Sequence, residues 1–414
     1  MQRAKPMSLE ETYDPTVAND GRDPIAPRVR SNVQWLLCAI FCCMAWGCGG
    51  GGSGSSPAPT QPPPPTPTPP PPPPPPPTTA TLLAVTNATS GTIDMLTIDT
   101  TTGVPTPIAG DPLPDGPTAS ALSIDPKKRY LYVSSTSGEV RGYLIDPSTL
   151  NLTAVTGSPF STGGQSLAIA VDPSGQFVLT ANGTANTVSV FKIGSAGALA
   201  EVAGSPFAAG AEPSAIVITG QYVYVANTGG NSVSAWTMDM TSGALTPVAG
   251  SPFVTTGSPN GLVVDIAGTH VYSTESAPNE LSGFSINATS GALTAIPGSP
   301  FAASYTIRSP VVDAEDKRLH TANGTNIDCF TINASSGALT EIGLSYTNGR
   351  AIAVALDGPD NFMYVLDNVD NQVEVFSIDP SDGGNITLIT GSPFALFPGA
   401  GSEDLGPNAI AVQH

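Results

Sequence analysis

Histidine and basic residues are scarce in this chain of 414 residues, which has three histidines and 14 lysines and arginines against 33 aspartates and glutamates. Nucleic-acid binding needs clustered basic side chains, so no nucleic-acid partner is expected. The net charge of −19 also disfavours anionic lipid surfaces and phosphorylated substrates. Three scattered histidines without any Cys/His metal spacing, and no glycine-rich phosphate loop opening a helix, lead us to expect neither metal nor cofactor.

Cysteine and helical patterns are equally scarce over most of the chain. Four of the five cysteines lie in or beside the apolar stretch Val33 to Trp46, and Cys329 stands alone. Cys329 is the only cysteine after the leader, which ends at Cys48, so no disulfide can form within residues 49–414. Between Thr81 and His414 no amphipathic stretch of helical period appears, which predicts an all-β domain stabilised by packing.

A short marker is repeated along this domain. Gly-Ser-Pro-Phe occurs five times, beginning at Gly157, Gly204, Gly250, Gly298 and Gly391. A degraded copy begins at Gly110, and Gly343-Leu344-Ser345-Tyr346 fills the one remaining gap. The seven markers follow one another at 45 to 48 residues, a period in the range of propeller blades. We interpret the recurring Phe as a packing plug between blades.

One repeat, Ala211 to Phe253, predicts the make-up of a blade. It contains runs rich in Val, Ile, Tyr and Thr, separated by turns of Gly, Asn and Ser, which is typical of an antiparallel four-stranded meander. The first repeat begins at Thr81 with a second-strand sequence, whereas the chain ends at Gly406 to Val412 with an innermost-strand sequence. We therefore predict a seven-bladed β-propeller over residues 81–414, closed by the C-terminal strand pairing beside Leu82 to Thr86.

The first 80 residues divide into a polar segment (1–32), a leader (33–48) and a Gly/Ser then Pro-rich spacer (49–80). The leader has a 14-residue apolar stretch and ends Ala45-Trp46-Gly47-Cys48, which resembles a bacterial lipoprotein signal with Cys48 as the lipidated residue. Trp46 departs from that pattern, and an uncleaved signal anchor or an ordinary cleaved signal are the alternatives.

The leader predicts an exported protein of the bacterial cell envelope, held to a membrane only through its lipid anchor. The unbroken proline run Pro69 to Pro77 predicts an extended spacer, and a ligand for an aromatic-groove module is the other interpretation. For the propeller we expect a monomer whose partner is an envelope protein, a glycan or a small molecule.

Three segments carry a family resemblance. Tyr222-Val223-Tyr224-Val225-Ala226-Asn227, Asn231-Ser232-Val233-Ser234 and Ser242-Gly243-Ala244-Leu245-Thr246 resemble the lactonase-type seven-bladed propellers, a group with 6-phosphogluconolactonases, a carboxymuconate cycloisomerase and propellers named for YVTN-like strands. The resemblance extends over nearly all of residues 81–414. It implies an Arg-His pair on the innermost strands and a Glu after a second strand as catalytic groups.

These groups are mostly missing here. Counted back from the Asp that ends each innermost strand, the Arg slots hold Ser120, Leu167, Ser214, Asn260, Arg308, Ile352 and Asn408. The His slots hold Ala121, Ala168, Ala215, Gly261, Ser309, Ala353 and Ala409. Only Arg308 matches, Glu275 lies one residue from the Glu slot, and no histidine lies at the channel mouth. Arg308 and Glu275 are thus the only catalytic candidates.

Polar residues at the start of the innermost strands suggest a site of another kind. Gln165, Glu212, Asn260, Arg308, Arg350 and Asn408 should converge at one mouth of the channel, where they either solvate the pore or bind a polar small molecule or glycan. Asp367 to Asn371 could offer oxygens to Ca²⁺ but is also an ordinary turn sequence, and no metal site is predicted. The sequence leads us to expect a non-catalytic binding or scaffold module. The alternatives are a hydrolase of sugar lactones at the channel mouth and a purely structural surface protein.

Overall fold

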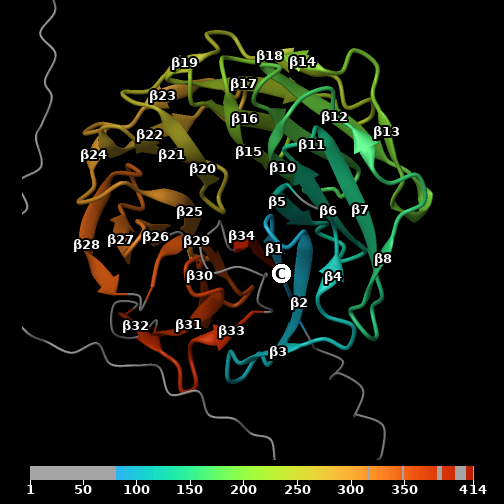
Figure 1. Ribbon diagram of the computed structural model, residues 1–414. Coiled ribbons are helices and arrows are strands. Elements are labelled where there is room, and N and C mark those ends of the chain that lie inside the picture. Colours follow the sequence, from blue (N-terminus) through green and yellow to red (C-terminus); the bar gives the residue numbers. More distant parts are fainter. Residues whose placement is uncertain are drawn as a thin grey trace, which may run out of the picture. The chain divides into compact units, whose positions relative to one another are not determined.

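The computed structural model describes residues 81–116, 118–315, 317–346, 349–379, 385–396 and 407–413. The leader, Cys48 and the spacer lie outside these residues. The described strands form seven antiparallel sheets of four or five strands around a common axis (Figure 1), so the predicted all-β, seven-bladed propeller is confirmed. Within the described ranges no helix is long and apolar enough to cross a membrane, and η1 (Ser195–Gly197) is a single 3-10 turn.

Blades are numbered 1 to 7 in the order of their second strands. The innermost strands of blades 2 to 7 and then 1 are β5 (Ala119–Ile124), β10 (Ser166–Val171), β15 (Pro213–Thr219), β20 (Pro259–Val264), β25 (Arg308–Val312), β29 (Ala351–Leu356) and β34 (Pro407–Val412). Each contacts the innermost strands of both neighbouring blades, and β34 lies between β29 and β5. These seven strands therefore line a closed ring around the axis.

The second strands lie behind the innermost ones and are buried on both faces. They are β1 (Thr81–Asn87), β6 (Tyr130–Ser135), β11 (Phe177–Asn182), β16 (Tyr222–Asn227), β21 (His270–Ser276), β26 (Arg318–Ala322) and β30 (Phe362–Asp367). The third strands are β2 (Thr92–Ile98), β7 (Glu139–Ile145), β12 (Thr187–Ile193), β17 (Ser232–Met238), β22 (Asn279–Ile286), β27 (Asn326–Ile332) and β31 (Gln372–Asp379).

The outer strands are short in six of the seven blades. They are β3 (Pro105–Pro107), β8 (Leu152–Ala154), β13 (Leu199–Glu201), β18 (Leu245–Pro247), β23 (Leu293–Ala295), β28 (Leu339–Tyr346) and β32 (Asn385–Leu388). A two-residue fifth strand pairs with the start of the third strand at β4 (Leu113–Pro114), β9 (Phe160–Ser161), β14 (Phe207–Ala208), β19 (Phe253–Val254), β24 (Phe301–Ala302) and β33 (Phe394–Ala395).

The Gly-Ser-Pro-Phe marker makes the step between the outer strand and this fifth strand. Its glycine has a φ near +90°, as at Gly204 (+88°), which an L side chain rarely adopts. Its serine hydroxyl bonds to the third strand where the outer strand has ended: Ser205 Oγ accepts the N–H of Val190 on β12 at 2.9 Å. The phenylalanine is half-buried, and Phe253 packs against a cluster shared by blades 4 and 5, as predicted for a plug.

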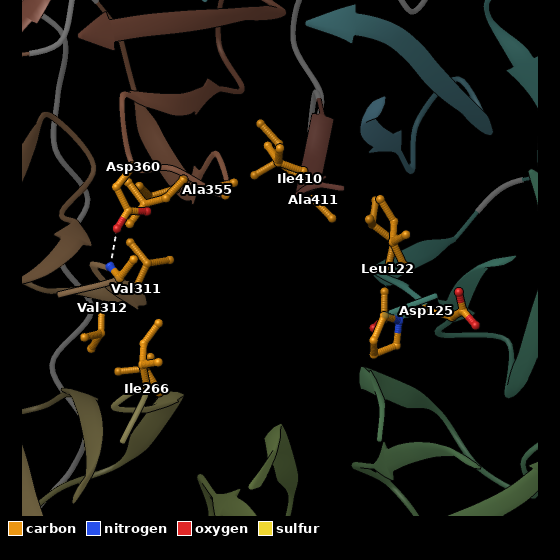
Figure 2. Close-up of a pocket in the computed structure, with 18 residues that line it drawn as sticks. Leu122, Asp125, Ile266, Val311, Val312, Ala355, Asp360, Ile410 and Ala411 are labelled. Carbon is orange, nitrogen blue, oxygen red and sulfur yellow. Dashed lines mark hydrogen bonds between the residues drawn. The ribbon is translucent and has the colours of Figure 1, made fainter. Parts of the chain in front are cut away.

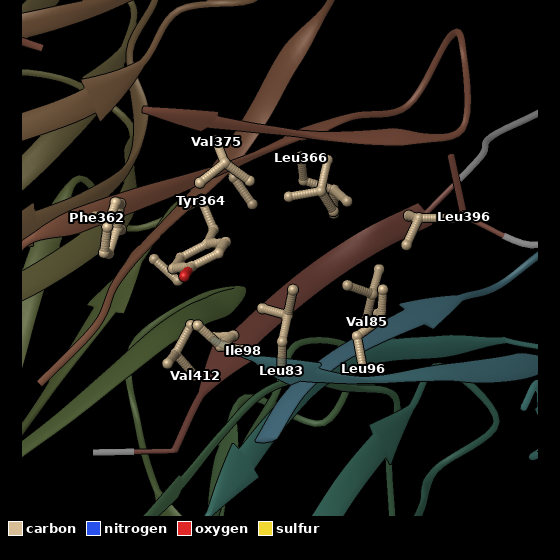
Figure 3. Packing of buried hydrophobic residues seen from close by; sticks show 13 residues of the cluster. Leu83, Val85, Leu96, Ile98, Phe362, Tyr364, Leu366, Val375, Leu396 and Val412 are labelled. Carbon is tan, nitrogen blue, oxygen red and sulfur yellow. The ribbon is translucent and has the colours of Figure 1, made fainter. Parts of the chain in front are cut away.

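The two ends of the chain close the ring as predicted. β34 pairs antiparallel with β1, with Val412 opposite Leu83 and Ile410 opposite Val85. Gln413 N donates to Leu82 O at 2.8 Å. Figure 3 shows the result: side chains of β34 and blade 1 pack against those of blade 7, including Tyr364 and Val375. Closure therefore buries one continuous cluster between the first and last blades.

In four blades a tyrosine of the second strand donates a hydrogen bond to the next blade. Tyr224 OH donates to the carbonyl of Gly291 at 2.9 Å, and Tyr364 OH donates to that of Gly103 at 3.2 Å. The ring of Tyr222 covers the same glycine, since a Cβ at Gly291 would lie 2.4 Å from it. This contact explains why Ser-Gly-Ala-Leu recurs in the turns, because only glycine leaves room for the ring.

Blade 6 departs from the repeat. The sequence predicts a seventh marker at Gly343, but β28 continues through this position as an eight-residue strand that pairs with all of β27. The sheet has four strands and no separate fifth strand. Leu344 stands where the marker has the serine whose hydroxyl accepts a strand N–H in other blades, so the outer strand itself continues along β27.

Candidate functional site

The channel along the ring axis has two different mouths. Because the blades repeat the same strand order, all seven innermost strands run along the channel in one direction. We call the end where they begin the N-terminal mouth and the end where they finish the C-terminal mouth. The predicted site residues Gln165, Glu212, Asn260, Arg308 and Arg350 lie at the N-terminal mouth. Asn408 is in β34 at the same mouth, and its side chain is outside the described part.

A β-bulge at the start of the innermost strands shapes this mouth. In blade 5 the register against the second strand slips between Pro259 and Gly261, which leaves Asn260 bulged. In blades 2, 3, 4, 5, 7 and 1 the bulged residues are Ser120, Leu167, Ser214, Asn260, Ile352 and Asn408. These are the positions at which the resemblance places the family's arginine. Bulges re-aim side chains and recur beside active sites.

Most polar side chains at the bulges connect blades. Ser214 Oγ donates to Pro259 O at 3.3 Å, and Asn260 Nδ2 donates to Ile307 O at 3.1 Å. Thr274 Oγ1 donates to Asn260 Oδ1 at 2.6 Å, so both ends of this amide are occupied. Ser120 likewise donates to a carbonyl of the next blade. Three of the seven slots in which the resemblance places the arginine are thus used here to bond neighbouring blades together.

Arg308 is the exception. In blade 6 the irregularity lies between Arg308 and Val311, so Arg308 pairs with Ala322 while Ser309 is bulged, with φ +50°. Ser309 supplies the contact between blades, because its Oγ accepts the N–H of Val354 at 3.1 Å. The half-buried guanidinium of Arg308 forms no ion pair with another described residue, and its buried Nε has no hydrogen-bond partner among them.

Glu212 and Arg350 are exposed at the same mouth, and Gln165 is half-buried. The backbone of Glu212 is fixed at φ +53°, since its N–H donates to Asn186 Oδ1 at 2.8 Å and its carbonyl accepts from Thr228 N at 2.9 Å. Its carboxylate lies over Gly229, where a Cβ would come within 2.9 Å of Oε2. Arg350 N donates to Asp367 Oδ1 at 3.0 Å. The predicted site residues thus bring one exposed carboxylate and two guanidinium groups to this mouth.

Glu275 does not face the channel. Its side chain is fully buried, with Oε2 accepting from Thr256 Oγ1 at 2.9 Å and Oε1 accepting from Ser282 Oγ. Burial raises the pKa of this carboxyl above its usual value, partly opposed by the hydroxyl donors. It occupies the place that Asn227 holds in blade 4, at the end of the second strand. Glu275 is therefore a structural residue of the blade, and of the two catalytic candidates only Arg308 is open to a ligand.

The described histidines also serve the fold. His270 Nδ1 lies 2.8 Å from Asp265 Oδ2, and its ring covers Gly337 of the next blade as Tyr222 covers Gly291. His320 is 1 % exposed, and burial lowers its pKa to about 4. It stands at the third position of its strand, where four other blades have the tyrosine that fastens neighbours. Both histidines lie in second strands, in β21 and β26.

The C-terminal mouth holds a cavity that the sequence did not predict. It has a volume of about 640 Å³ and is lined by the ends of the innermost strands of blades 1, 2, 5, 6 and 7 (Figure 2). Its walls are mainly aliphatic, from residues such as Leu122, Val311 and Ile410. The sequence contains runs of Val, Ile and Leu before the Asp that follows most innermost strands, but such runs are equally typical of a buried core.

Solved structures with the same fold include proteins of known and proposed activity. A proposed 6-phosphogluconolactonase from Bacteroides uniformis matches with a TM-score of 0.69 and 18% sequence identity, covering 80% of this chain and 99% of its own. The periplasmic gluconolactonase PpgL of Pseudomonas aeruginosa matches with a TM-score of 0.66 and 18% identity, covering 81% and 99%. At this identity the likeness supports the fold alone. No curated protein matches the chain by sequence.

The sequence pattern of the family described as "Lactonase, 7-bladed beta-propeller" matches residues 79–205 and 200–306, together more than half of the chain. This match, with lactonases among the structural neighbours, contradicts the expectation of a non-catalytic binding or scaffold module. That expectation gave too much weight to the missing Arg-His pair and too little to the family itself. The chain belongs to the lactonase family of seven-bladed β-propellers.

Proposed function

We propose that this protein is a lactone hydrolase that works at the N-terminal mouth of its channel, with Arg308 binding the lactone carbonyl. Membership of the lactonase family supports the reaction class. One observation carries the choice of site. Arg308 is half-buried, and its Nε has no described hydrogen-bond partner. The contact with the next blade is made by Ser309 instead, which leaves Arg308 available to a ligand.

Arg308 would stabilise the charge that develops during hydrolysis. When water attacks the carbonyl carbon of a lactone, the carbonyl oxygen becomes an oxyanion, and guanidinium N–H groups are strong donors to it. A half-buried guanidinium that has no carboxylate partner among the described residues needs little reorganisation to accept this charge. The same group then faces the carboxylate of the hydroxy-acid product.

Glu212 is the carboxylate best placed to handle the proton. It would accept a proton from the attacking water as the new C–O bond forms, and return it to the ring oxygen as the lactone C–O bond breaks. The product is a hydroxy acid, and no other reactant is consumed. The anchored backbone of Glu212 supports this role, because it holds the carboxylate over Gly229 at the edge of the mouth.

The mechanism differs from the one that the family resemblance implies. The His slot beside Arg308 holds Ser309, whose hydroxyl is bonded to Val354 N. An imidazole base is thus replaced by a carboxylate in this proposal. We expect the substrate to carry no phosphate, because Arg308 and Arg350 are the only cationic side chains among the mouth residues named above.

The proposed place of the reaction is the cell envelope. The lipoprotein-type leader and the proline-rich spacer support export and tethering. The spacer precedes Thr81, the start of β1, and Leu82 lies beside Gln413 at the C-terminal mouth. The first described residues after the spacer therefore lie at the C-terminal mouth, the end opposite Arg308.

The test is hydrolysis of glucono-δ-lactone and of unsubstituted γ- and δ-lactones by the full-length protein, measured as acid release above the uncatalysed rate. Arg308→Gln should lower kcat/KM by about 10² to 10³, the usual effect of removing an oxyanion donor. Lys192→Gln, which removes the same charge from an exposed strand, should leave it unchanged. No hydrolysis of any lactone by the wild-type protein, or an equal loss in both variants, would contradict the proposal.

A further inference from the structure

The cavity at the C-terminal mouth has the composition of a ligand site for an apolar molecule. Of its 18 lining residues, 14 are Ala, Val, Ile, Leu or Pro. Its volume, about 640 Å³, is within the range of small-molecule pockets. Leu122, Ile124, Val263 and Val312 are only half-buried, so part of this apolar lining is exposed to solvent. A ligand that displaced this solvent would bury apolar surface, which is favourable.

The rim extends the apolar surface outward. Ile266 stands in the turn after β20 with 65% of its surface exposed, and it points toward the opening in Figure 2. A large aliphatic side chain this exposed is unusual at a turn, where polar residues are the rule. It lies opposite Leu122 across the cavity. The apolar lining therefore reaches from the channel wall to the surface.

Three polar side chains line the cavity, and two of them are occupied. Ser123 Oγ accepts the N–H of Val171 at 3.2 Å. Asp125 accepts from the backbone N–H of Arg129 at 2.7 Å and from its Nε at 2.8 Å. In Figure 2 the Asp125 carboxylate points away from the opening. The Asp125 carboxylate is therefore engaged by Arg129, and the Ser123 hydroxyl by the backbone of Val171.

Asp360 is the third, and it differs. It is half-buried, and one carboxylate oxygen accepts the N–H of Ala314 across the boundary between blades 6 and 7. Burial and the nearby carboxylates Asp313, Asp357 and Glu315 raise its pKa to about 6. The cations on the neighbouring turn are already engaged, Lys317 with Glu315 and Arg318 at 4.0 Å from Asp313. At neutral pH this corner of the cavity therefore holds more negative than positive charge.

We propose that the C-terminal mouth binds an aliphatic ammonium compound, with its alkyl chain in the cavity and its cationic group against Asp360. The aliphatic walls select the chain, and the surplus of carboxylates selects the positive head group over a neutral or negative one. This site is at the opposite end of the channel from Arg308, and it does not depend on the proposed hydrolysis.

The test is isothermal titration of the full-length protein with butyl-, hexyl- and octylammonium chloride, and with octanol and octanoate as neutral and anionic counterparts. Each added methylene should tighten Kd about threefold to fourfold, the increment for a buried CH₂. Octylammonium should bind up to about fivefold more tightly than octanol, the scale of a partly exposed ion pair, and octanoate more weakly than both.

Two variants with little effect on folding separate the contributions. Asp360→Asn keeps an acceptor for Ala314 N and suits the φ of +54°, because Asn tolerates this region; it should remove the preference for the ammonium over the alcohol. Ile266→Gln should weaken all alkyl ligands about threefold or more. Val254→Gln, at an aliphatic residue 79% exposed on β19, is the matched control and should change nothing.

Three outcomes would overturn the proposal. One is a Kd that does not depend on chain length, which would exclude the aliphatic cavity. Another is an octylammonium preference that survives in Asp360→Asn, which would place the cation elsewhere. The last is equal weakening by Ile266→Gln and Val254→Gln, which would mean that the ligand binds the surface without using this mouth.

Discussion

The two mouths of the channel are built from the same seven strands, yet they differ in what their polar side chains do. At the N-terminal mouth the bulged residues Ser120, Ser214 and Asn260 bond to the next blade, whereas the Nε of Arg308 has no hydrogen-bond partner among the described residues. At the C-terminal mouth the terminal aspartates are bonded to the turns behind them, and Asp360 is the polar side chain that remains at the cavity. In a repeat protein the residues that recur in every repeat can hold the fold together, while residues that depart from the repeat remain available to bind a ligand.

This comparison is sharpest for the two carboxylates that remain open to a ligand. Glu212→Gln, at the N-terminal mouth, should lower kcat/KM for lactone hydrolysis by about 10² to 10⁴, the usual contribution of a general base. Asp360→Asn, at the other mouth, should leave kcat/KM within about twofold, because it contacts no reacting atom. Steady-state kinetics on both full-length variants checks the pair, and similar losses at both mouths would show that the mouths are not functionally distinct.

The next effect concerns stability, within blade 5. Asp265 accepts the N–H groups of Thr269 and His270 and also faces their side chains, at 2.6 to 2.9 Å. Asp265→Ala removes the charged acceptor of four hydrogen bonds that are partly buried and should cost about 3 kcal/mol of unfolding free energy. Asn260→Ala removes one bond to the next blade and should cost about 1 to 2 kcal/mol.

Urea unfolding of the two variants measures this difference. The order matters more than the absolute values, because the comparison assumes that the C-terminal mouth is fixed mainly within each blade and the N-terminal mouth mainly between blades. If Asn260→Ala proved the more damaging change, contacts between blades would outweigh the turns in holding the ring.

The smallest effect is the pH dependence of stability. Burial raises the pKa of Asp111, Asp328 and Asp360 to about 6 from an ordinary value of 3.8. A carboxyl group with a raised pKa in the folded state stabilises the fold while protonated, and this contribution is lost as pH rises from about 4 through 6. The lowered pKa of His320 acts oppositely, since its contribution is lost as pH falls from 6.5 toward 4.

Three carboxyl groups with a raised pKa favour the fold at low pH, and one histidine with a lowered pKa opposes them, so we predict a higher Tm at pH 5 than at pH 7.5. Asp360→Asn should reduce that rise, and His320→Leu should increase it. Calorimetric scans of the full-length protein at both pH values check the three results together. A Tm that falls at pH 5 in Asp360→Asn and wild type alike would mean that these carboxyl groups do not control the dependence.

Much of the fold followed from local sequence signals. The marker spacing predicted seven blades, and the mismatch between Thr81 and Val412 predicted the closing strand, because each blade needs one innermost strand and only the C-terminus could supply the first. The role of Ser205 was not predictable in the same way. Its bond to Val190 N depends on the outer strand leaving the sheet, which the residue pattern alone does not indicate.

The candidate site was predicted only in part. Arg308 was identified by counting back from Asp313. That Ser309 rather than Arg308 bonds to the next blade could not be predicted, because it depends on the bulge in blade 6 being shifted to Ser309, a matter of strand register. Glu275 was misjudged because its position in sequence does not reveal that Thr256 and Ser282 enclose it. The C-terminal cavity was missed because aliphatic residues at strand ends look the same in sequence whether they face a core or an opening.

A crystal structure of the full-length protein with a hydroxy acid such as gluconate would test the central claim most directly. The account predicts density at the N-terminal mouth, with the carboxylate of the acid against the guanidinium of Arg308 and Glu212 nearby. Gluconate bound only at the C-terminal mouth, or an Arg308 side chain that forms an ion pair within the protein and leaves the acid unbound, would contradict it.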